Sequence, residues 1–376
     1  MASNIAVDGL FLSNGFRGVG FNRYLTAILS SVALDDLSDE GPKLSILVPS
    51  LRDVAHLGVL PAKLRLVPFP AMRSVLLWRT GILLYATKLI KSDALFLPYP
   101  VPVYLKPKRL AVTIHDIIPL VFPDFYRSER ALMRSYGSSM ANADLILTDS
   151  EQSKADMMLH GVPGDKIRVA PLGFDSNLFR SCADEPTYSQ QVLGRHGVRP
   201  PYLLYVGQRM RHKNVERLVE AFGHLSRRHR DFDFQLVLAG WQLWERRELI
   251  ELVGQATSKR IVLTGRIPDG DLALLYRHAS LFAMPSLYEG FGLPVLEAMA
   301  SGVPVISSDR SSLPEVAGPA AVYFDPESAE EIAHAIEQVL TDSTLRETLI
   351  ERGLSRAKQF SWDDCARRTI AALREL

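Results

Sequence analysis

Short apolar runs alternate with helix-like patterns along the whole of this 376-residue chain. Such alternation predicts a parallel α/β architecture, because a helix that links two strands returns the second strand to the same sheet in the same direction. In the first half we expect strands at 5–7, 44–48, 64–67, 94–97, 110–115, 145–148 and 167–170, and helices at 21–34, 127–142 and 151–159. In the second half we expect strands at 202–206, 234–239, 261–264, 281–284, 303–306 and 321–324, and helices at 215–229, 243–255, 271–278, 293–300, 329–340 and 345–360.

The chain is long enough for two domains, each with its own core. Residues 176–201 are polar and irregular and end in Arg199-Pro200-Pro201, which indicates an interdomain connection. Because both halves repeat the alternation, we expect two Rossmann-like domains that bind ligands at the carboxyl ends of their strands.

Composition is that of an ordinary globular protein, with 47% hydrophobic and 23% charged residues. Two cysteines cannot build a disulfide framework and indicate a reducing compartment. Neither a signal peptide nor an apolar run of about 18 residues is present, so we expect a cytoplasmic protein without a transmembrane helix. The net charge of +1 argues against a nucleic-acid partner.

Positive charge gathers in residues 43–110, which hold eleven lysines and arginines against two acidic residues. Within this stretch, residues 72–85 have the pattern of a basic helix that contains Trp78 and Tyr85. Such a helix can lie on an anionic membrane surface. It can equally be an amphipathic helix packed on the core with its charges in water, and the two hypotheses are compatible.

The run from Glu289 to Glu297 places two carboxylates eight positions apart, around a glycine turn and a helix start at Leu293. Glycines let backbone N–H groups approach an anion closely, and a helix N-terminus favours a phosphate. Glu297 would then suit a ribose diol, and Glu289 would reach the far side of the ligand. The alternative is a capped helix that carries two surface glutamates.

Three further loops follow predicted strands. The loop 207–214 carries Arg209 and Lys213 before a helix, an arrangement that suits a diphosphate, although both could be surface cations. His115 and Asp116 stand at the end of another strand, where α/β proteins build their sites. The loop 15–20 is a weak dinucleotide signature, since Arg23 stands where a third glycine is needed.

These segments resemble a known family. The runs 286–294, 297–305 and 311–318 resemble the Glu-x7-Glu signature region of family 4 retaining glycosyltransferases, and the similarity extends from the 18–20 loop to residues 360–362. The resemblance implies the GT-B fold, in which two Rossmann-like domains face each other across a cleft and the last helix crosses back to the first domain. Residues 1–177 with 361–376 would form the acceptor domain, and residues 178–360 the nucleotide-sugar donor domain.

The resemblance also implies roles for individual residues. His115, Arg209, Lys213 and Glu289 would be catalytic, the two cations on the donor diphosphate and the other two near the transferred sugar. Many members carry the arginine at the position of Gln208, so Arg211 could share or replace the role of Arg209. The substrate-binding set would be Gly18, Gly20, Arg209, Lys213, Ile267, Glu289, Gly290, Phe291, Gly292, Leu293 and Glu297, with Ile267 at the nucleotide base.

The expected reaction is sugar transfer with retained anomeric configuration, without a metal or any other cofactor. The segments 115–120 and 205–209 look most like those of bacterial polysaccharide mannosyltransferases, which favours an alpha-mannosyltransferase that uses GDP-mannose. UDP-glucose or another UDP-sugar is the rival donor. The basic stretch fits a polyprenyl-diphosphate-linked oligosaccharide acceptor and a peripheral position at the inner face of the cell membrane.

Two motifs and two other protein classes remain. The Asp-x-Asp motifs at 231–233 and 269–271 look like a strand approach and a helix cap, so we expect no metal site. A nicotinamide-dependent oxidoreductase would need a full glycine fingerprint and an acidic residue after the second strand, which ends in Val48-Pro49-Ser50. A non-catalytic nucleotide-sugar binding module would keep the phosphate elements but lose Glu289 or His115.

Overall fold

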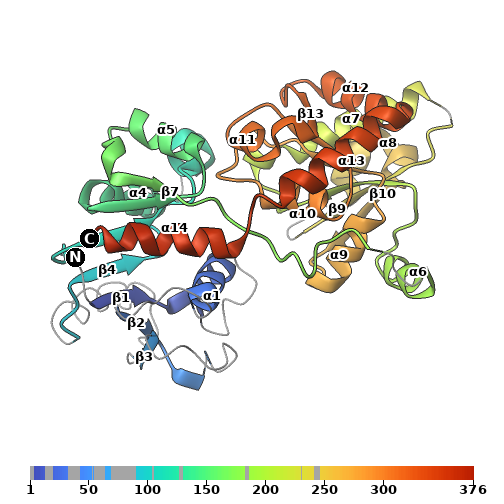
Figure 1. Ribbon diagram of the computed structural model, residues 1–376. Coiled ribbons are helices and arrows are strands. Elements are labelled where there is room, and N and C mark those ends of the chain that lie inside the picture. The colour runs from blue at the N-terminus through green and yellow to red at the C-terminus, as the bar shows by residue number, and fades with distance from the viewer. Residues whose placement is uncertain are drawn as a thin grey trace. The chain divides into compact units, whose positions relative to one another are not determined.

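The computed structural model describes residues 4–12, 20–32, 43–52, 54, 64–68, 90–103, 106–126, 130–182, 186–229, 231–240 and 246–376 (Figure 1). The chain divides into two compact units. The first unit comprises Met1–Gly173 together with Ser361–Leu376, and the second comprises Phe174–Phe360. The domain boundaries expected from the sequence lie after residues 177 and 360.

The first unit contains a sheet of seven parallel strands in the order β3-β2-β1-β4-β5-β6-β7. Its central strands are uninterrupted apolar runs that are buried on both faces, as expected for a parallel sheet covered by helices. The strands are β1 Asn4–Asp8, β2 Lys43–Val48, β3 Leu64–Pro68, β4 Ala94–Leu97, β5 Leu110–Thr113, β6 Leu145–Thr148 and β7 Ile167–Val169.

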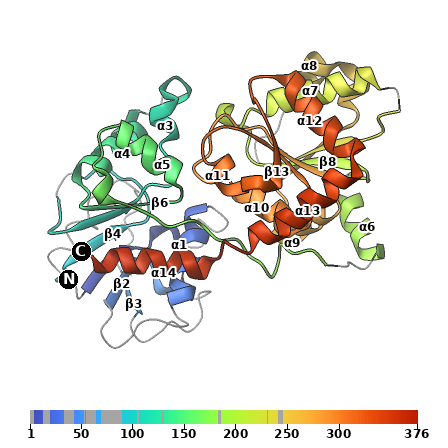
Figure 2. The same cartoon turned by 45° about the horizontal axis from the view of Figure 1, so that its top comes forward.

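Helices of the first unit include one from the C-terminal end of the chain. The α-helices are α1 Gly20–Val32, α3 Ile118–Val121, α4 Arg130–Asn142, α5 Glu151–Leu159 and α14 Trp362–Arg374, with 3-10 turns η1 Leu10–Leu12, η4 Pro123–Tyr126 and η5 Gly164–Lys166. Helix α14 packs along α1 and contacts β6 (Figures 1 and 2). The last helix therefore returns to the first unit, as the family resemblance implies.

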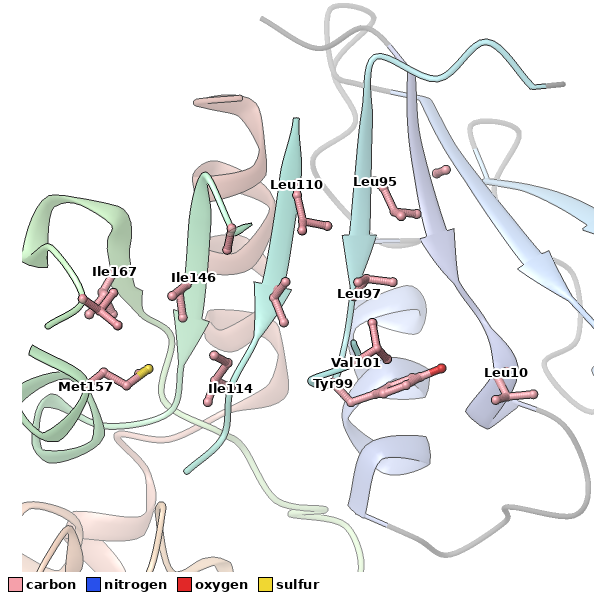
Figure 3. Packing of buried hydrophobic residues seen from close by; sticks show 14 of the residues in the cluster. Leu10, Leu95, Leu97, Tyr99, Val101, Leu110, Ile114, Ile146, Met157 and Ile167 are labelled. Carbon is pink, nitrogen blue, oxygen red and sulfur yellow. The ribbon is translucent and has the colours of Figure 1, made fainter. Parts of the chain in front are cut away.

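The core of the first unit is continuous along one face of its sheet (Figure 3). Leu95, Leu97 and Val112 from the central strands are fully buried, and Met157 of α5 closes the cluster on the side of β6 and β7. Burying side chains of this size stabilises the fold by roughly 1.5–3 kcal/mol each. This rigid packing fixes the strand ends from which the functional loops emerge.

The second unit contains six parallel strands in the order β10-β9-β8-β11-β12-β13. This is the doubly wound Rossmann order, which reverses between β8 and β11. The strands are β8 Tyr202–Val206, β9 Gln235–Ala239, β10 Ile261–Gly265, β11 Leu281–Met284, β12 Val305–Ser308 and β13 Ala321–Phe324. The helices are α6 Pro186–Arg195, α7 Val215–Arg228, α8 Arg246–Ser258, α9 Asp269–Arg277, α10 Leu293–Ala300, α11 Leu313–Ala317, α12 Ala329–Thr341 and α13 Ser343–Ala357, with 3-10 turns η6 Arg211–Lys213 and η7 Gly318–Ala320.

Three sequence expectations need correction. The connection 176–201 was expected to be irregular, but it contains α6, whose buried Val192 and Leu193 pack although polar residues dominate its sequence. Strand β12 begins at Val305, two residues later than expected, because Pro304 has no N–H to donate to the ladder. Strand β5 ends at Thr113, so His115 lies in the following loop.

Two expectations fall on residues outside the described parts: Gly18 and the basic helix-like segment 72–85. Among the residues that are described, no helix is long and apolar enough to cross a membrane.

Candidate functional site

The loops that follow β8 and β11 form one connected structure at the point where the strand order of the second sheet reverses. The Leu287 N–H donates to the His212 carbonyl at 2.7 Å, and Asn214 Nδ2 donates to the Pro285 carbonyl at 2.9 Å. Doubly wound sheets bind their ligands at such a point.

Lys213 and Glu289 meet at this junction. The Lys213 ammonium lies 2.7 Å from both carboxylate oxygens of Glu289, and the two side chains are 20% and 8% exposed. Ser286 Oγ donates a further hydrogen bond to Glu289 Oε1 at 2.6 Å. Both Lys213 and Glu289 were predicted from the sequence, and the structure joins them as a largely buried ion pair in which each fixes the other.

The glycine turn between Glu289 and α10 is held by two serines from a later segment. Ser311 and Ser312 donate from their hydroxyls to the Glu289 carbonyl at 2.7 and 2.8 Å, and Ser312 also reaches the Phe291 carbonyl at 2.9 Å. These bonds explain why residues 311–318 accompany the Glu-x7-Glu run: their hydroxyls satisfy buried carbonyls of the turn.

Gly292 is the last residue of the turn and the N-cap of α10. Its φ of +107° lies in a region that only glycine occupies easily, and a Cβ there would stand 2.8 Å from Leu313 Cδ2. Pro294 follows in the first turn of the helix, where its missing N–H costs nothing. The turn therefore places the N-terminus of α10 directly after the β11 loop. The N–H groups of a helix N-terminus can bind an anion there.

Glu297 is buried one turn into α10, where its Oε2 accepts a hydrogen bond from the hydroxyl of Tyr276 at 3.0 Å. Tyr276 comes from α9 and is itself fully buried. The carboxylate is thus held by a partner from a different helix, and the expected contact with a ribose stays a prediction.

Arg209 is engaged by two glutamates. Its Nη1 lies 2.9 Å from Glu248 Oε2 on α8, and its Nε lies 3.3 Å from Glu216 Oε1 on α7. Arg211 begins the 3-10 turn that ends at Lys213 and is exposed. Arg209 and Lys213 are thus both paired with carboxylates, Arg209 with two partly exposed glutamates and Lys213 with the buried Glu289.

His212 is buried and directly precedes Lys213 in the chain. Its pKa is lowered to about 4, mainly by burial and also by the charge of Lys213, while the charge of Glu289 opposes both effects. The imidazole is therefore neutral at neutral pH, and the positive charges of this turn are those of Arg211 and Lys213.

Ile267 lies at the carboxyl end of β10 and lines an open pocket of about 390 Å³ together with Arg266, Pro268 and Asp269. Its own side chain is buried. The pocket is large enough for a planar base, and the contact between Ile267 and a nucleotide stays a prediction.

His115 belongs to the first unit, in the loop after β5. Its Nδ1 lies 2.8 Å from Asp149 Oδ2, and its ring packs edge-on against Tyr24 at a centroid distance of 4.8 Å. The neighbouring Asp116 accepts a hydrogen bond from the Ile118 N–H at 2.9 Å and so holds the loop. In the same unit, Gly20 is the first residue of α1.

No group of three or more histidine, cysteine, aspartate or glutamate side chains is arranged to hold a metal in the described parts of the chain. A reaction without a metal stays a prediction.

The partners of the site residues that were not predicted from the sequence include Asp149, Tyr276 and Glu248. Only Asp149 had a signal in the sequence. It follows β6 directly, and β6 is the next predicted strand after the one that leads to His115. The other two come from helices whose packing decides which side chain they present.

Comparison with known proteins identifies the family. Residues 194–356 match the model of glycosyl transferases group 1. O-antigen chain mannosyltransferase B of Escherichia coli is 38% identical over 275 residues, which cover 72% of this chain and 71% of that protein. The serotype-specific mannosyltransferase WbdA of Escherichia coli is 28% identical over 273 residues, which cover 70% of this chain but only 33% of WbdA.

The fold has solved counterparts. Sucrose-phosphate synthase from Thermosynechococcus elongatus superposes with a TM-score of 0.73 at 22% identity, covering 99% of this chain and 98% of that one. The family resemblance and the two-domain α/β fold inferred from the sequence are thereby confirmed, and a nicotinamide-dependent oxidoreductase is no longer supported. This chain belongs to the group 1 glycosyltransferases and has the GT-B fold.

Proposed function

We propose that this glycosyltransferase moves mannose from GDP-mannose to a lipid-linked oligosaccharide, with retained configuration, during bacterial polysaccharide assembly. The names of its relatives support this: one is an O-antigen chain mannosyltransferase and another a serotype-specific mannosyltransferase. The 38% identity to the first covers more than two thirds of both chains.

The observation that carries the proposal is the pairing of Lys213 with Glu289 at the switch point, one turn before the N-terminus of α10. When the bond between the sugar C1 and the phosphate oxygen breaks, negative charge develops on the departing diphosphate. A fixed ammonium and the N–H groups of a helix start stabilise such charge without reorganising. The cations of this scheme are Lys213 and Arg209, and Arg211 of the same loop shares or replaces the role of Arg209.

Glu289 has the role of orienting the sugar. Its carboxylate is held by Lys213 and Ser286, which fixes its direction but lowers its reactivity as a nucleophile. The acceptor hydroxyl attacks C1 from the face that the diphosphate leaves, and the leaving phosphate oxygen takes the hydroxyl proton. His115 contacts the sugar from the first unit.

The remaining donor contacts follow the residues of the second unit. Glu297 binds the ribose hydroxyls while Tyr276 holds its carboxylate in place, and Ile267 lies against the base in the pocket at the end of β10. Gly290, Phe291 and Leu293 supply the backbone around the phosphates, and Gly20 is a further substrate-binding residue in this proposal.

No cofactor takes part in this scheme, and the acceptor is reached at the inner face of the cell membrane. The surplus of positive charge in residues 43–110 supports a peripheral association with anionic lipid. A UDP-sugar such as UDP-glucose is the second candidate donor, since the residues around the diphosphate do not distinguish the two bases.

The test is donor hydrolysis by the purified protein without divalent metal. GDP-mannose, GDP-fucose, UDP-glucose, UDP-galactose and UDP-N-acetylglucosamine are compared, and the anomer of any transfer product is assigned by NMR. We expect GDP release from GDP-mannose and an alpha-linked product. In Glu289→Gln, turnover should fall at least about 100-fold, because the sugar loses its orientation, whereas the exposed control Glu347→Gln should keep full activity.

Three results would overturn parts of this proposal. Selective release of UDP would show that the donor is a UDP-sugar and not GDP-mannose. A product with inverted anomeric configuration would show that the enzyme is not a retaining glycosyltransferase. If no donor is hydrolysed and neither GDP nor UDP stabilises the protein against heat, the proposed donor site is wrong. That result would favour a non-catalytic binding module of another kind.

A further inference from the structure

His115 and Asp149 lie together because of strand register. Strands β5 and β6 are parallel neighbours in which Thr113 pairs with Leu147, and the Ile114 N–H donates to the Leu147 carbonyl at 2.8 Å. Both segments therefore leave the sheet side by side. The two side chains meet at 2.8 Å between Nδ1 and Oδ2, and they are 16% and 4% exposed.

The imidazole is fixed from other directions as well. Tyr24 of α1 packs edge-on against the ring, and its own hydroxyl is bonded to Thr113 Oγ1 at 3.1 Å. The hydroxyl of Ser153, in the first turn of α5, donates to the His115 carbonyl at 3.3 Å. Ring and backbone of His115 are thus held by three elements, and the segment that begins at Asp149 supplies two of these contacts.

The contact with Asp149 decides which ring nitrogen carries a proton. A carboxylate can only accept, so Nδ1 must be the donor, and Nε2 is left as the nitrogen at which protonation changes. Burial lowers the pKa of His115, but the charge and hydrogen bond of Asp149 and the charge of Asp116 raise it more, so the pKa is raised overall. Burial raises the pKa of Asp149, and His115 opposes that effect.

Among the described residues, the other titratable groups that face this pair are Tyr24 of α1 and Cys365 of α14. Burial raises the pKa of Tyr24 and also that of Cys365, which contacts the Ala170 carbonyl beside β7. Both groups are therefore neutral at neutral pH. The negative charge around His115 comes from Asp149 and Asp116.

We propose that Asp149 is a positioning residue of this glycosyltransferase, which holds the His115 imidazole in the Nδ1–H tautomer and in one orientation for its action on the donor sugar. The proposal rests on the proposed role of His115. In this role Asp149 acts through His115 and not on the sugar itself.

The test compares Asp149→Asn with Asp144→Asn. The first substitution preserves the shape and an acceptor oxygen but removes the charge. Asp144 stands at the other end of β6, where it binds Lys106 and the Leu110 N–H, and so controls for damage to the strand. We expect Asp149→Asn to lower kcat at least about 10-fold with little change in the KM for the donor. The limb of the pH profile that reports His115 should move to lower pH, because the charge that raises its pKa is gone. Asp144→Asn should move neither.

A second readout needs no activity. The protein is labelled with ¹⁵N-histidine, and the His115 signal is assigned by its loss in His115→Gln. We expect the Nδ1–H tautomer in the wild type and a mixture of tautomers in Asp149→Asn. An unchanged tautomer, or an unchanged kcat and pH profile in an active enzyme, would overturn the role of Asp149. If no donor is turned over but the tautomer behaves as expected, the proposed function fails and the control of the tautomer by Asp149 stands.

Discussion

At the scale of single residues, the ion pair between Lys213 and Glu289 is expected to contribute to the stability of the second unit as well as to the donor binding that we propose. Removing one partner leaves a charge in a largely buried place, which costs more than removing both. We expect Lys213→Met to destabilise the protein by about 2 kcal/mol, and the double variant with Glu289→Gln to be less destabilised than the sum of the two single variants by about 1 kcal/mol or more. Urea denaturation measures all three.

An exposed pair in the same unit provides the control. Arg247 and Glu251 lie 2.9 Å apart on α8, with side chains 86% and 63% exposed. Because solvent screens such a pair, the corresponding cycle should show a coupling below about 0.5 kcal/mol. Equal coupling in the two cycles would contradict the view that burial makes the Lys213–Glu289 pair special.

His212 gives the same region a dependence on pH. Its pKa is about 4 in the folded protein and near 6.5 in the unfolded chain. Between these values the unfolded state binds more protons, so stability is lost as the pH falls from about 6.5 to 4, by up to about 3 kcal/mol. We expect Tm to drop less between pH 7 and pH 4.5 in His212→Asn than in the wild type. The control is His334→Asn at an exposed position, which should show the same drop in Tm as the wild type. An equal drop in Tm in wild type and His212→Asn would show that His212 does not cause the loss of stability at low pH.

At the scale of elements, the start of α10 depends on one backbone conformation. Gly292→Ala would place a Cβ 2.8 Å from Leu313 at a φ of +107°, so the turn or α11 must move. We expect a loss of about 1–2 kcal/mol of stability and a donor affinity about 10-fold weaker or worse. Thermal denaturation and nucleotide titration measure the two effects.

A glycine without these restraints provides the comparison. Gly194, near the end of α6, would place its Cβ in open space and has no positive φ. Gly194→Ala should therefore be neutral or slightly stabilising. If both variants behave alike, neither the positive φ nor the contact with Leu313 makes the turn require glycine.

The elements themselves show what sequence can predict. Strand β11 and helix α10 have the bounds expected, because a glycine turn and Pro294 mark the helix start without ambiguity. Helix α6 was missed, since its sequence is mostly polar and its two buried apolar residues form no long stripe. The end of β5 was misplaced because Ile114 still bonds to β6 although the regular strand has ended.

At the scale of the whole molecule, the chain passes between its two units twice, after Gly173 and after Phe360. The two passages lie side by side within the first unit: a Cβ on Gly173 would stand 2.0 Å from the backbone nitrogen of Trp362. Helix α14 begins at that point and continues along α1. A glycine at residue 173 thus allows the close approach that brings the C-terminal helix back to the first unit.

The contacts of the candidate site residues were predictable to a similar degree. Lys213 and Glu289 are far apart in sequence, but each follows a strand at the switch point, so topology alone brings them together. The engagement of Arg209 by Glu216 and Glu248 was not predictable, because it depends on how α7 and α8 pack. The order of strands and helices in the sequence determines which loops meet. Tertiary packing determines which partner each side chain contacts.

In the proposed function, Lys213 and the start of α10 bind the diphosphate of a nucleotide sugar. Calorimetric titration of GDP into wild type, Lys213→Met and the control Arg352→Met, which lies on α13, tests it most directly. We expect GDP to bind the wild type and Arg352→Met equally and to bind Lys213→Met at least about 10-fold more weakly, a difference of about 1.4 kcal/mol. Equal GDP affinity in all three proteins would show that Lys213 does not bind the diphosphate.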